Sequence, residues 1–387
     1  MKGLNTNFYR LFLALFVFFV LVSIPIWNIM ITKGEHVETS EMRWFIYSTY
    51  LLVLFGIFVL LSHFELKGSF IHLICLLWCL LTPIVLFLNH AELPHYVLVL
   101  LWPVVFEMSY LSILAFPRRL NSIYNSYWVI FLWGVFLFLT SKAIGYAMIS
   151  PNSVYVPLLT MPILMIKNTS KFRLVMLIVF SLLALFSMKR SSMLIIAAVW
   201  VAYGFLLFKM KNKVVAIIAV GALIVCGVYL FVRMNVAMEG KIIERIEREE
   251  TDDGKNRLAI WQVTWAMIQQ SSVTEKLIGH GHYGVRNDSI LEVSAHNDIL
   301  EVIYDYGLII FALYLGLWCY LLIRWWYLRK VQSNLLLPYT ISLAIFVVMS
   351  LVSHLILYTS YFNFLVMFWG CTEAMIMNRE KLLAVKR

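Results

Sequence analysis

Long uncharged apolar runs constrain this chain more than any other feature of its sequence. Six of them approach or exceed the roughly 20 residues that span a bilayer. They are 11–32, 44–62, 68–91, 120–141, 143–166 and 214–232. Inside lipid such a run must be helical, because each backbone polar group has to find its hydrogen-bond partner within the segment. The sequence therefore predicts an all-α, polytopic integral membrane protein.

Hydropathy divides the chain into about 12 candidate membrane spans and one long polar segment. The chain is 62% hydrophobic and only 13% charged, which is more apolar than a soluble core requires. The candidate spans are 11–31, 44–62, 70–88, 96–116, 127–141, 152–166, 172–188, 192–208, 214–232, 308–326, 336–353 and 355–377. We expect helices one to nine within 1–232, a polar loop carrying the chemistry at 233–305, and helices ten to twelve with a tail within 306–387.

The distribution of basic residues predicts the orientation of these spans, since short cytoplasmic loops carry an excess of Lys and Arg. With a cytoplasmic N-terminus, 18 of the 31 Lys and Arg residues fall in cytoplasmic connections, five fall in short outer connections and eight fall in the polar loop. The rule discounts long loops. Both termini are therefore predicted to be cytoplasmic and the loop to lie outside, in the periplasm of a Gram-negative cell.

One outer connection departs from this bias. Lys189 and Arg190 are adjacent in the turn between the seventh and eighth spans, on the same predicted side as the polar loop. Two cations held there against the usual preference indicate an anionic ligand. An ordinary pair at a helix end, contacting lipid headgroups, is the alternative.

The polar loop is predicted to contain two helices before a glycine-rich turn. Residues 239–257 combine an isoleucine stripe with charge pairs four residues apart, which favours an interfacial helix. A second helix is expected over 257–270, with Leu258, Trp261, Trp265 and Ile268 on one face. Arg257 would begin it, where a cation is unfavourable, so either an anionic ligand or a neighbouring carboxylate is expected to offset its charge.

His296 is the strongest candidate for a catalytic residue. The turn GHGHYG (279–284) precedes it, and Ser294 is a suitable N-cap for a helix that continues to Gly307. His296 would then lie in the first turn, where the helix dipole lowers the pKa of a histidine. A neutral imidazole there could act as a general base near pH 7. A structural histidine bonded to the loop is the alternative.

No cofactor is predicted. His280 and His282 could in principle join His296 around a metal ion, but their spacing matches no zinc signature. The five cysteines all lie in apolar runs, which indicates neither a zinc site nor a disulfide framework. Glu107 lies inside a span, where a carboxylate is either functional or paired with another helix.

Four segments follow one another in the second half of the chain: SMKRSSM (187–193), NRLAIWQVTW (256–265), LIGHGHYG (277–284) and AHNDILEVIYDYGLI (295–309). In order and spacing they resemble the O-antigen ligase and O-antigen polymerase superfamily of bacterial membrane glycosyltransferases. The resemblance covers about 187–326. A further glycine that the family usually has soon after the position of Gly307 is missing here.

The resemblance implies an enzyme of the bacterial inner membrane that takes a glycan from a polyprenyl diphosphate. Arg190 and Arg257, with Lys189, would bind the diphosphate, and His296 would activate the acceptor hydroxyl. The residues that could support them are Asn297, Glu301 and Gly281. The implied partners are the lipid-linked glycan, membrane lipid and a chain-length regulator protein, with no nucleic acid.

Three functions remain open at this point. A polymerase would add another lipid-linked repeat unit, and a ligase would transfer the glycan to lipid A core. We favour the polymerase because EVIYDYG (301–307) and MKRSSM (188–193) look more like polysaccharide polymerases. A transporter of lipid-linked sugars or anions would need polar residues along the spans and an internal repeat. Glu107 is the only polar residue that offers itself for such a path, and no internal repeat is evident in the sequence.

Overall fold

The computed structural model describes residues 6–33, 40–63, 70–143, 151–167, 170–187, 189–207, 257–331, 333–353 and 355–385, together with positions 229, 232, 233 and 236. Every regular element in these ranges is helical, as the apolar runs predict. The first eight helices are α1 (Thr6–Lys33), α2 (Ser40–His63), α3 (Phe70–Leu88), α4 (Leu93–Ala115), α5 (Leu120–Ala143), α6 (Tyr155–Leu164), α7 (Ser170–Ser187) and α8 (Arg190–Leu207). Two short 3-10 helices, Pro117–Arg119 and Pro151–Val154, precede α5 and α6. The later helices are α11 (Arg257–Gln270), α12 (Val273–Ile278), α13 (Gly284–Asp288), α14 (Asp298–Lys330), α15 (Leu336–Val352) and α16 (Thr359–Val385).

Four helical segments in the described ranges are long and apolar enough to cross a membrane: Phe70–Leu88, Leu93–Ala115, Pro117–Thr140 and Asp298–Lys330. The protein is therefore an integral membrane protein. The count of about 12 spans stays a prediction. The candidate span at 214–232 lies almost wholly outside the described residues, and the candidate at 152–166 contains a ten-residue helix, about 15 Å long, which is half of a hydrocarbon core.

Three helices form the centre of the bundle. Every residue from Leu101 to Leu114 in α4, and from Ser360 to Ala374 in α16, is buried, as are all ten residues of α6. A helix that is apolar and buried on all sides has to be surrounded by other helices. Accordingly α4 packs against α16, α2 and α3, while α6 packs against α5, α15 and α16.

The carboxylate of Glu107 is paired within this bundle. Its Oε1 lies 2.7 Å from Nδ1 of His72 on α3, and both side chains are buried. The His72 ring also contacts the ring of Tyr110, with centroids 4.5 Å apart. Pairing with another helix, one of the two alternatives for this residue, is what the structure contains.

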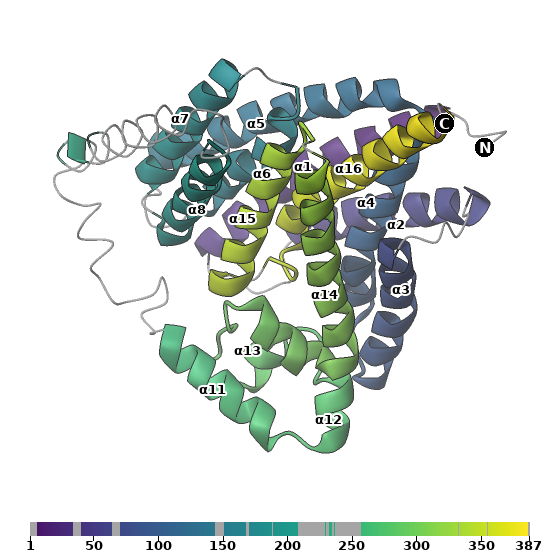
Figure 1. Ribbon diagram of the computed structural model, residues 1–387. Helices are drawn as coiled ribbons and strands as arrows, with labels where there is room; N and C mark the ends of the chain where they lie inside the picture. The colour runs from purple at the N-terminus through teal and green to yellow at the C-terminus, as the bar shows by residue number, and fades with distance from the viewer. Residues whose placement is uncertain are drawn as a thin grey trace.

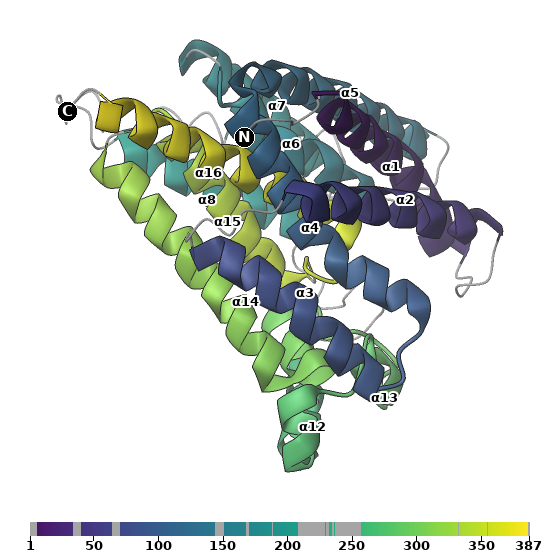
Figure 2. The same cartoon turned by 90° about the vertical axis from the view of Figure 1, so that its right-hand side faces the viewer.

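The helices of the polar loop gather at one end of the molecule. Figure 1 shows α11, α12 and α13 together at the end of the molecule where α14 begins, and Figures 1 and 2 show the last turns of α16 at the opposite end. The side chain of Asn89, in the turn between α3 and α4, donates to the carbonyl oxygen of Ile278 at the end of α12, 3.0 Å away. The loop helices are thus held against the bundle rather than extended from it.

Candidate functional site

Helix α11 begins at Arg257 and ends at Gln270, as predicted, and it contacts the bundle through its first two turns. An Arg257 guanidinium N–H donates to the carbonyl oxygen of Val352, the last residue of α15. The indole N–H of Trp261 donates to the carbonyl oxygen of Ala295, 2.9 Å away. These contacts place the start of α11 beside the end of α15 and beside the residue that precedes His296.

The predicted apolar face of α11 is only partly right. The buried side chains are Ile260, Thr264 and Ile268, whereas Leu258 and Trp265 are 58% and 50% exposed. Thr264 can occupy a buried position because its hydroxyl donates to the carbonyl oxygen of Ile260, 2.9 Å away. Counting apolar residues alone therefore misplaced the face. The predicted interfacial helix at 239–257 lies outside the described residues apart from Arg257.

The glycine-rich turn docks onto a break in α14. Gly307 has φ 76° and ψ 176°, which interrupts the helix, so the carbonyl groups of Tyr304 and Asp305 lose their normal helical donors. The N–H groups of His280 and Gly281 bond to these two oxygens instead, at 3.0 and 2.8 Å. Gly279 and Gly307 have positive φ, and a Cβ on either would overlap a facing backbone oxygen.

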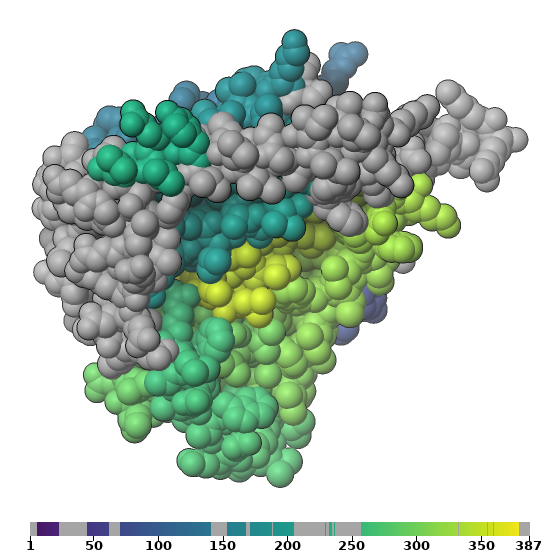
Figure 3. All heavy atoms as spheres, turned by 60° about the vertical axis from the view of Figure 1, so that its left-hand side comes forward, coloured from purple at the N-terminus to yellow at the C-terminus, as the bar shows by residue number. Residues whose placement is uncertain are grey.

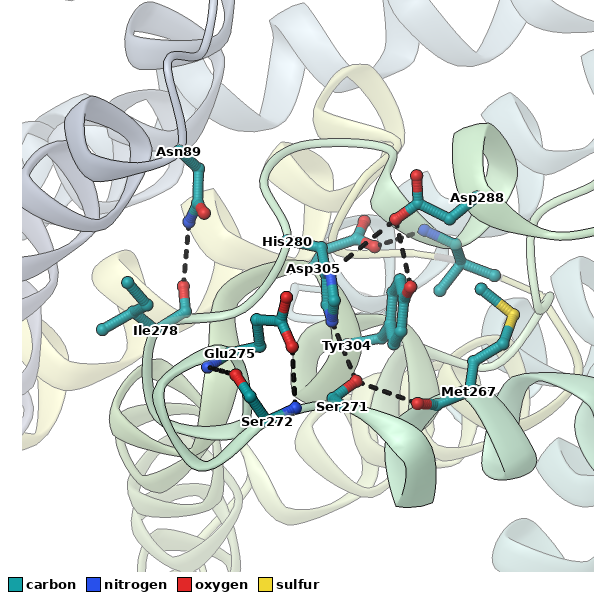
Figure 4. Close-up of polar contacts among 11 residues, drawn as sticks. Asn89, Met267, Ser271, Ser272, Glu275, Ile278, His280, Asp288, Tyr304 and Asp305 are labelled. Carbon is teal, nitrogen blue, oxygen red and sulfur yellow. Dashed lines mark hydrogen bonds and ion pairs between the residues drawn. The ribbon is translucent and has the colours of Figure 1, made fainter.

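A polar cluster fastens this turn from the outside (Figure 4). The His280 ring stacks on the Tyr304 ring with centroids 4.0 Å apart, and its Nε2 lies 2.9 Å from Oγ of Ser271. The Tyr304 hydroxyl donates to Oδ2 of Asp288 at 3.0 Å. His280 therefore contacts Ser271 directly after α11, Asp288 at the end of α13 and Tyr304 in α14, which supports a structural role for it.

His282 is buried on the other side of the same turn. Its Nδ1 bonds to the Tyr306 hydroxyl, and its ring lies 4.4 Å from the ring of His95, in the first turn of α4. Burial, with a smaller effect from His95, holds the pKa of His282 well below its usual value. Burial also raises the pKa of the neighbouring Tyr283 to about 12. Both groups are therefore neutral at physiological pH.

His296 does not lie in the first turn of a helix, so that prediction was wrong. The helix begins at Asp298, and Asn297 is its N-cap, with Oδ1 accepting from the N–H groups of Ile299 and Leu300 at 3.0 and 3.3 Å. Ser294, the predicted N-cap, precedes this position by three residues. His296 therefore precedes the N-cap and is not a first-turn residue on which the helix dipole would act.

The backbone of His296 is instead held in the left-handed region, with φ 54°. For a residue with a side chain, this conformation costs on the order of 1 kcal/mol and persists only where surrounding contacts impose it. Here the contact comes from buried Glu301, whose Oε1 accepts the His296 N–H at 2.9 Å. Glu301 also accepts a hydrogen bond from the N–H of Ala295. Glu301 thus holds the backbone conformation that sets the direction of the His296 side chain.

Asp298 connects this turn to the segment that follows α15. Its Oδ1 accepts the N–H of Ile356 at 3.2 Å, and its Oδ2 accepts the hydroxyl of Tyr314 at 3.1 Å. The amide of Asn297 donates to the carbonyl oxygen of Leu351 at 3.4 Å. Asn297 and Arg257 therefore contact adjacent carbonyl groups at the end of α15.

Lys189 and Arg190 lie at the start of α8, which packs against α15. Nζ of Lys189 lies 4.9 Å from the ring centroid of Tyr155, and Tyr155 contacts Tyr361 with ring centroids 5.8 Å apart. Tyr361 contacts Tyr358 in turn, with centroids 6.2 Å apart. Tyr358 is close enough to Glu301 and Tyr283 to interact with them electrostatically. A row of tyrosines thus joins the cation pair to the turn that holds His296.

These contacts gather the selected residues around one segment, 351–361. Arg257 and Asn297 bond to its first residues, Asp298 bonds to its middle, and the tyrosine row leads from its end to Lys189. On the face shown in Figure 3, yellow C-terminal atoms lie between the teal atoms of the α7–α8 region and the green atoms of α11 to α13. Gly281 lies apart, in the glycine-rich turn, with φ 97° and its N–H bonded to Asp305.

Comparison with known families identifies this region. The family model described as O-antigen ligase matches residues 174–315. This region is similar to that family. The match contains the cation pair, Arg257, the glycine-rich turn and His296, and it confirms the resemblance to the O-antigen ligase and polymerase superfamily. The match supports enzyme activity of the ligase or polymerase type in general. No curated protein sequence matches the chain significantly.

Sequence reasoning missed the tyrosines and assigned Asp298 only loosely. Tyr155, Tyr358 and Tyr361 lie near helix ends, where aromatic residues are common at membrane interfaces, so their local sequence does not separate the two roles. Asp298, Glu301 and Asp305 follow His296 in the sequence and could orient it or bind sugar hydroxyls, but the sequence indicates no partner for Asp298. Its hydrogen bond to Ile356 joins residues 58 positions apart in the sequence, and no local pattern predicts it.

Proposed function

We propose that this protein polymerises polyprenyl-diphosphate-linked oligosaccharide repeat units into a surface polysaccharide, at the periplasmic face of the bacterial inner membrane. One observation carries the proposal. The family region contains Arg257 and His296, and the contacts of Arg257 and of Asn297, the neighbour of His296, meet on adjacent carbonyl groups at the end of α15. A guanidinium group that matches phosphate is thus anchored beside the turn that carries His296.

The arginines suit the leaving group. Lipid diphosphate gains negative charge as the glycosidic bond breaks, and guanidinium groups match phosphate oxygens in a two-pronged geometry. Arg257 uses one donor for the Val352 carbonyl group, which orients the guanidinium and leaves further N–H donors for phosphate. Arg190 and Lys189, at the start of α8, would supply the second cationic contact.

His296 suits the acceptor. The acceptor hydroxyl oxygen attacks the anomeric carbon, its proton passes to the neutral imidazole, and the electron pair of the broken bond leaves on the lipid diphosphate. Attack opposite the leaving group inverts the anomeric centre. The step needs no general acid, because diphosphate is already a weak base, and two arginines can take the role that a metal ion has elsewhere. Glu301 positions the base by holding the His296 backbone.

Ligation to lipid A core is the second candidate, because the matching family model is described as O-antigen ligase. It uses the same donor and the same chemistry, and differs only in the acceptor. Transport of a lipid-linked sugar is the alternative of another class. Pairing of Glu107 with His72 weakens that alternative, since Glu107 was the main polar group proposed for a path through the spans.

Deletion of the gene in its own host, followed by complementation at matched expression, tests the proposal. The variants are His296→Ala, Arg190→Ala and Arg257→Ala, with Arg286→Ala as the control for loss of an exposed arginine on α13. We expect about 10²–10⁴-fold slower transfer without the base and about 10²–10³-fold without an arginine. The Arg286 variant should restore the wild-type ladder of surface polysaccharide on a gel.

The products separate the candidates. Loss of the ladder, with one repeat unit still attached to lipid A core, supports the polymerase. Loss of every attached repeat, with long chains accumulating on the polyprenol carrier, supports the ligase instead. Wild-type ladders from all three site variants would overturn the catalytic assignment and favour the transporter.

A further inference from the structure

A pocket of about 220 Å³ lies at the opposite end of α4 from the candidate site. Helix α4 has 23 residues and is therefore about 34 Å long. Its first turn carries His95, which contacts His282 of the glycine-rich turn, whereas its last turns carry Ser109 and Ser112, which line the pocket. The start of α1 and the start of α5 complete the lining. This pocket therefore takes no part in the proposed glycosyl transfer.

Three arginines line the pocket. Arg10 comes from α1, and Arg118 and Arg119 come from the 3-10 helix after α4. The lining contains no carboxylate. Arg10 and Arg119 are close enough to repel each other electrostatically, which is unfavourable unless an anion lies between them. The guanidinium of Arg119 is tethered, because it donates to the carbonyl oxygen of Thr6 at 2.5 Å.

A buried hydroxyl supplies an independent sign of a ligand. Tyr9 lines the pocket and is only 1% exposed, yet its hydroxyl has no hydrogen-bond partner in the part of the chain that the structure describes. Buried hydroxyl groups are nearly always bonded, because water has been removed from them. The ring of Tyr9 is fixed against Phe116, with centroids 6.1 Å apart, so the hydroxyl cannot turn freely away.

Most of the remaining lining is apolar. The apolar side chains are Phe12, Leu13, Met108, Ile123 and Met367, and the other lining residues are Ser109, Ser112 and Ser122. A site for a soluble anion needs polar walls, whereas a lipid phosphate brings hydrocarbon chains that such side chains accommodate. The distribution of basic residues also predicts that Arg10, Arg118 and Arg119 lie at the cytoplasmic membrane surface, where anionic lipids gather.

We propose that this pocket binds a phosphate group, carried by the headgroup of an anionic phospholipid, between the three arginines and the Tyr9 hydroxyl. The guanidinium groups bond the phosphate oxygens, the tyrosine donates a further hydrogen bond, and the apolar side chains contact the first carbons of the lipid. The site joins α1, α4 and α5 at the end of the bundle away from the transfer chemistry.

Native mass spectrometry of the full chain, in mixed micelles that contain a known amount of phosphatidylglycerol, tests this proposal. It measures how much of the lipid stays bound to the protein. The main variants are Tyr9→Phe, which removes only the hydroxyl, and Arg10→Gln with Arg118→Gln. Arg329→Gln with Lys330→Gln is the control, because it removes the same charge from the predicted cytoplasmic end of α14. Circular dichroism of each purified variant establishes that its helices are retained.

We expect the double arginine variant to weaken retention of the lipid at least about tenfold, and Tyr9→Phe to weaken it by about fivefold to tenfold. The control should retain the lipid as the wild type does. Equal losses in both double variants, or unchanged binding by Tyr9→Phe, would overturn the site. Displacement of the lipid by millimolar inorganic phosphate alone would overturn the lipid source in favour of a soluble phosphate.

Discussion

The carboxylates at the outer end of the molecule differ in their partners from those inside the bundle. Asp298, Glu301 and Asp305 each accept a backbone N–H group, from Ile356, His296 and Val285 respectively, and Asp298 also accepts the Tyr314 hydroxyl. Glu107 and Glu373 bind side chains instead: the first pairs with His72, and the second with Arg324 and the Tyr320 hydroxyl. Burial alone therefore does not say what a carboxylate does.

The difference teaches what each group controls. A carboxylate that accepts backbone N–H groups fixes the course of a loop, because the donors belong to the main chain and cannot rotate away. A carboxylate paired with a side chain joins two helices and leaves the main chain of each unchanged. We therefore expect substitution of the outer carboxylates (Asp298, Glu301 and Asp305) to disturb the candidate site. Substitution of the bundle carboxylates (Glu107 and Glu373) or their partners should reduce stability while the geometry of the site is retained.

The largest expected effect comes from breaking the bundle pair. Arg324→Leu leaves the Glu373 carboxylate, which is 1% exposed, without its cation, and should cost about 3–5 kcal/mol of unfolding free energy. Thermal unfolding in detergent measures it. The double variant Arg324→Leu with Glu373→Leu should recover most of the loss, since no unpaired charge remains. A double variant no more stable than the single one would contradict this account.

The next effect comes from the outer group. Glu301→Ala removes the acceptor of the His296 N–H and should cost about 1–3 kcal/mol, with at least about tenfold slower transfer as the histidine moves. Glu301→Gln keeps an acceptor oxygen and serves as the matched control, with a smaller loss of both quantities. Stability loss with unchanged transfer would show that Glu301 does not position His296.

Lowering the pH tests a buried group at the outer end of the molecule, the imidazole of His282. Its pKa is depressed in the folded protein by burial, so below the unfolded value of about 6.5 the unfolded chain binds a proton that the folded chain excludes. Stability should therefore be complete above pH 6.5 and fall as pH decreases, by at most about 1.4 kcal/mol per pH unit from this group. His282→Asn should reduce that slope. An identical slope would contradict the assignment.

The smallest effect tests which residue caps α14. Asn297→Ala should cost about 1 kcal/mol, because Asn297 Oδ1 accepts two N–H groups of the first turn. Ser294→Ala, at the position favoured by sequence alone, should change stability by less than about 0.5 kcal/mol. The same thermal unfolding measurement compares the two. A larger loss at Ser294 would restore the cap predicted from sequence.

Local chemistry made parts of the fold and site predictable. The apolar runs predict helices because lipid offers backbone groups no other partner. The predicted bounds of 257–270 for α11 agree with the structure, and the glycines at 279 and 307 lie where a side chain does not fit. The four ordered segments were enough to indicate the family region, since they record spacing as well as composition.

Other features depend on contacts between distant parts of the chain. The cap of α14 is at Asn297 because Asn297 and Asp298 bond to Leu351 and Ile356, and these contacts decide where the turn ends and the helix starts. The partner of Glu107 lies 35 residues away on another helix. The exposed face of α11 depends on what surrounds it, which its own periodicity does not contain.

The sequence by itself determined that this protein is a helical membrane protein and that its region 174–315 resembles the O-antigen ligase and polymerase superfamily, because hydropathy and motif spacing are properties of short segments. Only the tertiary structure decided the backbone conformation of His296 and which carboxylates hold loops and which join helices. It also decided that Tyr9 and three arginines line the same pocket. Those features arise where segments far apart in the chain meet, and local sequence carries no record of such meetings.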